Sequence, residues 1–389
     1  MSSMGTVIVK PGREKRLLQG YPWIQKSELL RIDAPGKGEV VTVLDSKNQL
    51  IGIGTFNRAT RFQVRMLARE QVAVDREFFL NRFKRAIEYR KQLSIDSNGM
   101  RLVFSEADRL PGLIVDKYGD SLVVQVRSLG MEQLRSEWIP ALIESIRPSG
   151  IYEKSEMVGR EDEGLPSRAE LIFGEVPGVA SINELGMDYG VSFRSGLKTG
   201  FYFDQRLTRK RWREQIKPGE NVLDAFCYSG SFSLHAAAAG AKVLGIDINE
   251  AALQQASENA KINNLNPSFE LANAFEWLEA NKSGPVYDWI MLDPPAIAKS
   301  SGKRDALKWA IWKLVYHALP LLKPGGRLVV CNCSFQLSLH ETIETCRFAA
   351  ADRGEFLSLE DITLQDADHP AATWFPESLY LKCVWLRKL

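Results

Sequence analysis

The sequence lacks long apolar runs: nowhere do about eighteen apolar residues follow one another, the length that a membrane-spanning helix needs. Its first sixteen residues, MSSMGTVIVKPGREKR, also lack the apolar core of a secretory signal peptide. Cysteine is scarce, with five in 389 residues and no C-x-x-C pair, which argues against a disulfide framework and against a zinc site. We therefore expect a soluble, cytoplasmic protein with no metal and no membrane partner, in which any important cysteine acts as a free thiol.

Overall charge is also small, at +2, so it offers no argument for nucleic-acid binding. The charge is uneven, however, because residues 1–70 hold twelve Lys and Arg against six Asp and Glu. The same segment contains the β-like runs VIVKPG, GEVVTVLD, LIGIGTF and RFQVRML, broken by Gly, Pro and Asn. A compact basic β module would suit a polyanion, although a solvated charged face explains the count equally well. Trp23 is expected to be a core or domain contact rather than a base-stacking platform.

The length predicts two or three domains, since single cores rarely grow beyond about 250 to 300 residues. After residues 1–70, the pattern changes to a helix with Asp75 near its start, followed by hairpin-like strands, a second helix over 131–146 and further strands. We assign residues 71–195 to an α+β middle domain and residues 196–389 to a third domain, in which helices and strands alternate.

One stretch of the third domain, Asn221 to Asp247, reads NVLDAFCYSGSFSLHAAAAGAKVLGID. It begins with a short apolar strand (Val222, Leu223), passes through a turn of small residues and an Ala-rich helix ending at Gly240, and closes with a second strand, VLGI. This pattern predicts one βαβ unit. Its turn lies at the carboxyl end of the first strand, where open parallel sheets bind their ligands.

Two classes of cofactor fit such a unit. A dinucleotide site has the pattern G-x-G-x-x-G, but here Asp224 ends the strand and only Gly230 lies in the turn. A carboxylate at Asp224 repels a pyrophosphate and suits the cationic, zwitterionic S-adenosylmethionine. The pair Ser229-Gly230 lets backbone N–H groups approach a ligand, and Asp247, about twenty residues on, can accept hydrogen bonds from ribose hydroxyls. The spacing favours a methyltransferase over a nucleotide-binding or purely structural unit.

Helices and strands continue to alternate after this unit, which predicts a doubly wound sheet. Its strand ends collect on one rim and carry five polar or reactive groups: Asp224, Asp247, Asn273, Asp293 and Cys333. A cationic cluster precedes the unit, around a helix that starts near residue 204, and is either a solvated face or a contact for phosphates; it comprises Lys198, Arg206, Arg209, Lys210, Arg211 and Arg213.

Several strings resemble the bacterial 23S ribosomal RNA cytosine-5 methyltransferases that carry an N-terminal PUA domain. In the third domain these are LDAFCYSGSFSLHA, GIDINEAALQQASENAKINNL, DWIMLDPPA, LKPGGRLVVCNCS and DHPAATWFPESLYLK. GYPWI and PGKGEVVTVLD resemble the PUA module, and SEADRLPGLIVDKYGD and KTGFYFDQR the family's middle and pre-sheet segments. The resemblance implies an α/β doubly wound, Rossmann-like methyltransferase domain, preceded by a small β-barrel-like PUA domain and an α+β middle domain.

The resemblance also implies residue roles. Cys333 would be the nucleophile, Asp293 would act with it under the target base, and Asn273 would lie by the adenine. The residues that would bind S-adenosylmethionine are Gln205, Arg206, Asp224, Ala225, Phe226, Tyr228, Ser229, Gly230, Asp247, Ile248, Asn273, Ala274, Asp293 and Pro294. The implied partner is 23S ribosomal RNA or its precursor, and the chain would be a monomer or a homodimer.

The chemistry explains why a thiol is needed. Carbon 5 of cytosine is a poor nucleophile, so a thiolate first adds to carbon 6 and makes carbon 5 reactive, which is covalent catalysis. Cys333 supplies the thiolate if nearby positive charge lowers its pKa. Cys331 shares its strand face and is the second candidate, whereas Cys227, Cys346 and Cys383 are expected to be inert and buried.

Three positions depart from the family pattern: Asn273 stands where Asp is usual, Ala296 where Lys or Arg is usual, and Phe335 where Gly is usual. The last two alter the substrate side. Two other functions therefore stay open. An amino-directed RNA or DNA methyltransferase would also use an Asp-Pro-Pro loop, although Ala296 and Ile297 offer no aromatic ring to stack a base. An RNA-binding protein with a degenerate methyltransferase domain is the non-enzymatic alternative.

Overall fold

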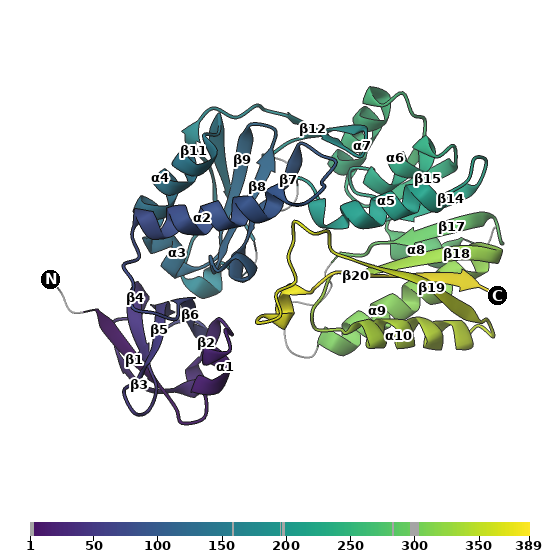
Figure 1. Ribbon diagram of the computed structural model, residues 1–389. Helices are drawn as coiled ribbons and strands as arrows, with labels where there is room; N and C mark the ends of the chain where they lie inside the picture. The colour runs from purple at the N-terminus through teal and green to yellow at the C-terminus, as the bar shows by residue number, and fades with distance from the viewer. Residues whose placement is uncertain (1–3, 158, 195, 197–198, 282–283, 296–302) are drawn as a thin grey trace. The chain divides into compact units, whose positions relative to one another are not determined.

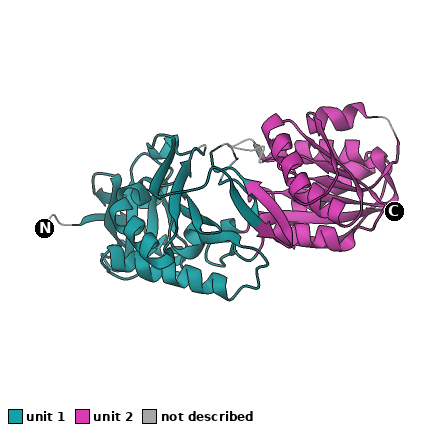
Figure 2. Ribbon diagram, turned by 90° about the horizontal axis from the view of Figure 1, so that it is seen from above, with its two compact units in different colours: residues 1–182, 191–203, 367–378 teal, residues 183–190, 204–366, 379–389 magenta. Residues whose placement is uncertain are grey.

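The computed structural model describes residues 4–389 except 158, 195, 197–198, 282–283 and 296–302 (Figure 1). The chain divides into two compact units. Unit 1 comprises residues 1–182, 191–203 and 367–378, and unit 2 comprises residues 183–190, 204–366 and 379–389 (Figure 2). Most of the first two predicted domains thus lies in one unit, apart from residues 183–190, and the predicted boundaries after residues 70 and 195 stay predictions. Across the described ranges, no helix is both long and apolar enough to cross a membrane.

The N-terminal part of unit 1 is a six-stranded sheet with the order β2-β6-β5-β4-β1-β3, in which β1 runs parallel to β4 and the other neighbours are antiparallel. Alternating apolar side chains such as Val41 and Val43 point into its core. The predicted β runs are therefore strands. The elements are β1 (Gly5–Val9), α1 (Glu14–Leu18), β2 (Trp23–Gln25), β3 (Leu29–Asp33), β4 (Lys37–Leu44), β5 (Leu50–Asn57) and β6 (Phe62–Ala68).

The middle part of unit 1 is a five-stranded sheet with the order β11-β10-β9-β8-β7, and helices pack against this sheet to form its core. Asp75 caps the first helix by accepting a hydrogen bond from Phe78 N at 3.0 Å, as its place in the sequence predicts. The elements are α2 (Arg76–Lys91), β7 (Gly99–Phe104), the 3₁₀ turn η2 (Ser105–Asp108), β8 (Leu113–Tyr118), β9 (Ser121–Val126), α3 (Leu129–Gln133), α4 (Arg135–Ile146), β10 (Gly150–Ser155) and β11 (Arg168–Gly174).

The helix predicted over 131–146 is two helices, α3 and α4. Ser128 caps α3 through Met131 N, so helical structure starts earlier than predicted. The chain then leaves helical geometry at Leu134, where ψ is 14°. The indole N–H of Trp138 donates to the Met131 carbonyl at 2.9 Å, which gives an acceptor of α3 a partner across the break.

Trp23 links the N-terminal sheet to the rest of unit 1, as predicted. Its indole N–H donates to Glu106 Oε1 at 2.9 Å, and its ring packs on Phe62 and Phe375 at centroid distances of 4.5 and 4.6 Å. Arg65 reaches Glu106 at 3.1 Å and Glu163 at 2.7 Å. These contacts bury charge and aromatic surface together, so the N-terminal sheet is firmly attached within unit 1.

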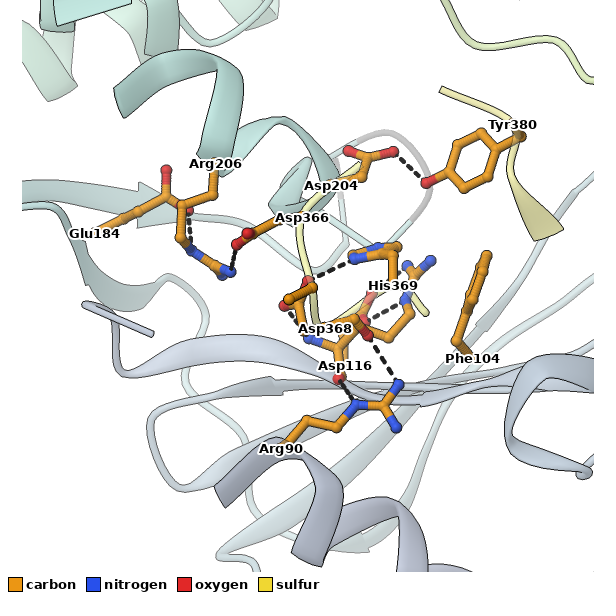
Figure 3. A network of polar contacts seen from close by, with 12 residues as sticks. Arg90, Phe104, Asp116, Glu184, Asp204, Arg206, Asp366, Asp368, His369 and Tyr380 are labelled. Atoms are coloured by element: carbon orange, nitrogen blue, oxygen red, sulfur yellow. Dashed lines mark hydrogen bonds and ion pairs between the residues drawn. The ribbon is translucent and has the colours of Figure 1, made fainter. Parts of the chain in front are cut away.

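The segment 367–378 belongs to unit 1 although it is distant in sequence. Asp368 is fully buried and accepts hydrogen bonds from Arg101 N at 3.0 Å and from the ring of His369 at 2.6 Å (Figure 3). Arg90 donates to the Asp368 carbonyl at 2.8 Å and forms an ion pair with Asp108. A buried polar network therefore holds this segment.

Unit 2 is built on a seven-stranded sheet with the order β16-β15-β14-β17-β18-β20-β19. The first five strands are parallel, and β20 runs antiparallel to β18 and β19. Its elements are α5 (Arg206–Gln215), β14 (Asn221–Ala225), α6 (Ser231–Ala238), β15 (Lys242–Asp247), α7 (Glu250–Ile262), β16 (Ser268–Leu271), α8 (Ala274–Ala280), β17 (Tyr287–Leu292), α9 (Lys303–Ala318), β18 (Leu322–Asn332), α10 (Leu339–Ala351), β19 (Leu357–Leu364) and β20 (Lys382–Lys388). A hairpin, β12 (Ala180–Glu184) and β13 (Met187–Val191), precedes them.

Helices cover both faces of this sheet. Leu223, Ile290 and Val330 face the core formed with α8, α9 and α10, whereas Val222 and Trp289 face α5 and α6. Because strand residues alternate between faces, continuous apolar runs such as WIML in β17 fill both cores. The doubly wound sheet is therefore confirmed, and β19, β20 and α10 add to it elements that the sequence reading did not assign.

Candidate functional site

The strand order of unit 2 reverses beside β14. The chain proceeds from β14 to β15 and β16 in one direction, and then from β17 to β18 in the other. Ligands of open parallel sheets bind at such a switch point, beyond the carboxyl ends of the strands. The carboxyl ends of β14 and β17 meet here, and Asp293 N donates to Ala225 O at 3.4 Å. Of the predicted residues, Asp224, Ala225, Asp293 and Pro294 lie at this point.

The loop after β14 is tightly wound. Phe226 (φ 66°), Tyr228 (φ 49°) and Gly230 (φ 79°) all adopt left-handed backbone conformations. Such conformations strain residues other than glycine, and strain of this kind clusters at ligand sites. A Cβ at Gly230 would lie 2.9 Å from Ala256 Cβ, so glycine is needed here for space as well as for φ. The carbonyl of Ile246 holds the loop by accepting from two of its backbone N–H groups.

Asp224 is fully buried at the end of β14, on the face that packs against α6. Its Oδ2 accepts a hydrogen bond from the Ser233 hydroxyl at 2.6 Å. Its Oδ1 is buried without a hydrogen-bond partner in the described part of the chain. Burial raises the pKa of Asp224 to about 7, and the Ser233 hydrogen bond opposes the rise. A buried acceptor with no partner is unusual in a native fold and suits a cationic group of a ligand.

Asp247 ends β15 next to the same loop. Its two carboxylate oxygens accept backbone hydrogen bonds from Tyr228 N at 2.8 Å and Asn249 N at 2.9 Å. These bonds orient the carboxylate and leave each oxygen a second lone pair, as a bidentate acceptor for ribose hydroxyls requires. The neighbouring Ile248 side chain is 71% exposed.

Asn273 and Ala274 lie at the start of α8. Asn273 is the N-cap of this helix: its Oδ1 accepts from Phe275 N at 3.0 Å, and its Nδ2 donates to Glu276 at 3.1 Å. The capping role explains a short polar residue here, and contact with an adenine stays a prediction.

Gln205 joins Asp293 to a cysteine that the sequence reading treated as inert. Its Nε2 donates to Asp293 Oδ2 at 3.2 Å, while its Oε1 accepts from the Cys383 thiol at 3.5 Å. Since the two ends of the amide have different partners, its orientation is set. Gln205 thereby fixes the Asp293 carboxylate at the rim, a link that a local sequence pattern could not reveal.

Cys331 and Cys333 differ in environment. Cys331 lies within β18 and is fully buried, opposite Cys383 of β20 and 3.8 Å from Met291 Sδ. Burial, followed by the neighbouring Cys383, raises the pKa of the Cys331 thiol well above its ordinary value. Cys333 is the first residue after the carboxyl end of β18 and is only partly buried. Between the two, the accessible thiol at the rim is therefore Cys333.

Lys382, which the sequence reading missed, lies next to Cys333. It pairs with Asn332 in the β18–β20 ladder, and its Nζ donates to Ser334 O at 2.6 Å. Burial lowers the pKa of Lys382 to about 8, and the nearby Cys333 and Cys383 thiols act in the opposite direction. No strand was predicted here, and only the register between β18 and β20 brings this lysine to the cysteine.

Two members of the predicted cationic cluster are neutralised inside unit 2. Arg206 and Arg209 of α5 are buried and pair with Glu184 at 3.1 and 2.6 Å, and Arg206 also pairs with Asp366 (Figure 3). This favours a structural role over phosphate contact for these two, and cofactor contact by Arg206 stays a prediction. Lys198, Ala296 and Ile297 lie outside the described residues.

Comparisons with known proteins agree with this geometry. Residues 7–69 match a family model described as a PUA-like domain, and residues 216–369 match one described as a methyltransferase domain. The ribosomal RNA large subunit methyltransferase I of Shewanella amazonensis is 35% identical over 384 residues, which cover 96% of this chain and 97% of that protein. The protein of the same name from Tolumonas auensis is 34% identical and covers 99% of both chains.

Among solved structures, a SAM-dependent methyltransferase from Streptococcus mutans shares the fold. The TM-score is 0.86 at 21% identity, and the match covers 99% of this chain and 100% of the other. A further solved methyltransferase, complexed with SAH, matches to the same degree. With sequence identity above 30% to named relatives along nearly its whole length, the chain belongs to the ribosomal RNA large subunit methyltransferase I family, whose members combine an N-terminal PUA domain with an S-adenosylmethionine-dependent methyltransferase domain.

Proposed function

We propose that this protein transfers a methyl group from S-adenosylmethionine to carbon 5 of a cytidine in 23S ribosomal RNA, with Cys333 as the covalent nucleophile. Its relatives are named as methyltransferases of large-subunit ribosomal RNA, and the chain spans nearly their whole length. The observation that carries the covalent step is the position of Cys333, a partly exposed thiol one residue beyond β18, beside a lysine.

The residues at the switch point fit S-adenosylmethionine. The unpartnered Oδ1 of Asp224 suits its ammonium group, the loop from Phe226 to Gly230 would follow its methionine part, and Asp247 would accept its ribose hydroxyls. Ala225, Tyr228, Ser229, Ile248, Asn273, Ala274 and Pro294 would complete the surroundings. When bound, the cofactor supplies an electrophilic methyl group.

The thiolate of Cys333 would add to carbon 6 of cytosine, forming a sulfur–carbon bond and moving the electrons of the 5,6 double bond to carbon 5. Carbon 5 then takes the methyl group. Removal of its proton by a base restores the double bond and expels the thiolate, so the enzyme is regenerated. Asp293, oriented by Gln205, would hydrogen-bond the base edge and stabilise the adduct.

Lys382 would favour the thiolate. A cation near a thiol stabilises its charged form and lowers its pKa. The hydrogen bond from Lys382 Nζ to Ser334 O holds that cation beside the segment that carries Cys333. Lys382 would thus be the positive charge that the sequence argument required.

The test is covalent trapping on 23S ribosomal RNA that contains 5-fluorocytidine. Fluorine at carbon 5 cannot leave as a proton does, so only a thiol mechanism gives a stalled protein–RNA adduct. We expect an adduct with the wild type and with Cys331→Ala, and none with Cys333→Ala, while calorimetry shows equal cofactor affinity in all three.

The other outcomes identify the alternatives. If Cys333→Ala still methylates the RNA near the wild-type rate, the amino-directed function replaces this proposal. A wild type that binds RNA but neither binds the cofactor nor forms an adduct would be the degenerate, non-catalytic protein. Bisulfite mapping of 23S ribosomal RNA from a strain without the gene should reveal one unmodified cytidine, and an unchanged pattern would argue for another substrate.

A further inference from the structure

Unit 1 contains a cavity of about 300 Å³. The N-terminal sheet, α2, the turn after η2 and the segment 367–378 all contribute to its wall. Four arginines line it, Arg69, Arg82, Arg85 and Arg109, together with two glutamates, Glu70 and Glu106. One of the glutamates is already paired, because Glu106 accepts from Arg65 at 3.1 Å. The cavity therefore carries a net positive charge.

Arg82 is the unusual member of this group. Arg82 is only 7% exposed, and its guanidinium donates a hydrogen bond to the Leu67 carbonyl at 2.8 Å. Within the described residues it has no carboxylate at ion-pair distance. The other buried arginines each have one within 3.2 Å; they are Arg90, Arg160, Arg206 and Arg209.

The pKa of Arg82 reflects the lack of a nearby carboxylate. Burial lowers the pKa of Arg82 to about 10, and the charges of Arg109 and Arg85 lower it further than Glu70 can offset. A buried charge without a counter-charge is costly, and native folds rarely keep one unless a ligand supplies its partner. Three guanidinium groups at one cavity repel one another, and a bound anion would offset this repulsion.

Two more residues complete the wall. Arg109 has a left-handed backbone (φ 58°), and its guanidinium lies over the Trp374 ring at 5.3 Å. Arg69 lies over Gly20: a Cβ there would come within 2.5 Å of its Nη2 and within 3.1 Å of Trp374 Cβ. Glycine at this position therefore keeps the wall open to the side chains of Arg69 and Trp374.

We propose that this cavity binds a backbone phosphate of the RNA substrate, with Arg82 and Arg109 as its principal contacts. The inference rests on the proposed function for the identity of the polyanion. Guanidinium groups pair with phosphate oxygens through two parallel hydrogen bonds, and the aromatic ring of Trp374 beside them suits a nucleotide better than an acidic peptide. The site would anchor the RNA on unit 1 independently of the reacting base.

The experiment measures binding of protein-free 23S ribosomal RNA over a series of salt concentrations. The Arg82→Gln/Arg109→Gln variant should bind at least 10-fold more weakly, and the slope of log affinity against log salt should fall by about 1 to 2. The matched control is Arg76→Gln, which should bind like the wild type. Arg76 is an exposed residue of α2, the helix that carries Arg82, and it pairs with Glu144. Cofactor affinity should be unchanged in both.

Arg109→Gln alone is the safeguard against misfolding, because Arg109 is exposed; it should lose affinity in the same direction. Double and single variants with wild-type affinity and slope would overturn the proposal while leaving the proposed function intact, provided the wild type still methylates. A wild type that neither binds nor methylates this RNA would instead refute the proposed function. Loss of binding to polyglutamate without loss of RNA binding would assign the cavity to an acidic peptide and overturn the proposal.

Discussion

Cys331 and Cys333 lie two residues apart, yet their thiols differ in burial and therefore in reactivity. Cys331 lies within β18, where burial disfavours the thiolate, and the carboxyl end of the strand lies between it and Cys333. Two residues of a strand span nearly 7 Å, which is more than a reacting pair tolerates. Only one of these thiols can therefore serve a base bound at the rim, and accessibility favours Cys333.

Lys382 provides the first prediction at this scale. Replacing it with Met should raise the pKa of Cys333, because the thiolate loses its neighbouring cation. The rising limb of the pH–rate profile should move to higher pH by about one unit, with activity recovering at alkaline pH. Lys382→Arg keeps the charge and should restore most of the profile. An unchanged profile in Lys382→Met would show that the lysine does not act on the thiol.

Asp224 provides the second prediction, which concerns the pH dependence of stability. An unfolded Asp has a pKa of about 3.9, whereas the folded residue titrates at about 7. Between these values the native state keeps a proton that the unfolded state has released, so this group lowers the free energy of unfolding as pH rises, by about 1.4 kcal/mol per pH unit. Asp224→Asn removes this dependence.

Urea denaturation at pH 5 and pH 8 measures that effect. The variant should gain stability relative to the wild type between the two pH values, because only the wild type must ionise a buried carboxyl group. A difference between the two proteins that is the same at both pH values would mean that the Asp224 pKa is not raised.

The grouping of site residues was predictable from the sequence where its determinants are local. Asp224, Gly230 and Asp247 belong to one continuous βαβ unit, so their grouping follows from strand and helix periods alone. The contacts of Lys382 with Ser334 and of Gln205 with Asp293 depend on which distant strands become neighbours, and no periodicity encodes that.

Among the elements, the loop between β14 and α6 gives a test of packing. Gly230→Ala must accept a left-handed φ and a contact of 2.9 Å with Ala256, whereas Gly219→Ala accepts a similar φ with open space around it. Both variants should lose stability because alanine is strained at a positive φ. Gly230→Ala should lose about 1 to 3 kcal/mol more from overpacking. Chemical denaturation of the two variants measures the difference. Equal losses would show that α7 yields to the added methyl group.

Element types were largely predictable and some boundaries were not. The short apolar runs of β14, β15 and β17 indicated strands, and the structure confirms them. The break between α3 and α4 was missed because the spacing of apolar residues continues through Leu134 and does not encode the contact between the Trp138 indole and Met131 O. Strands β19 and β20 were missed because they follow each other without an α-helix between them, unlike the alternating strands before them.

At the scale of the whole molecule, unit 1 depends on a segment made late in the chain. Asp368→Ala would leave Arg101 N buried without its acceptor, and should destabilise unit 1 by about 1 to 3 kcal/mol. Thr373→Ala, an exposed position of the same segment, is the control and should have little effect. Hydrogen exchange resolves the two units: faster exchange in β7 and α2 with unchanged exchange in β14 and β15 is expected. Uniformly faster exchange would contradict a local role.

The interleaving of the two units has a consequence for biosynthesis. A ribosome makes β18 and β19 before β20, yet β20 is the strand that lies between them. It also makes almost all of unit 1 before residues 367–378, which carry Asp368 and Phe375. A nascent chain that stalls before residue 367 would thus expose two unpaired strand edges in one unit and leave the backbone N–H of Arg101 without its acceptor in the other. Cellular proteases would then cleave the truncated chain in preference to the complete protein, because neither unit of the truncated chain would have a complete core.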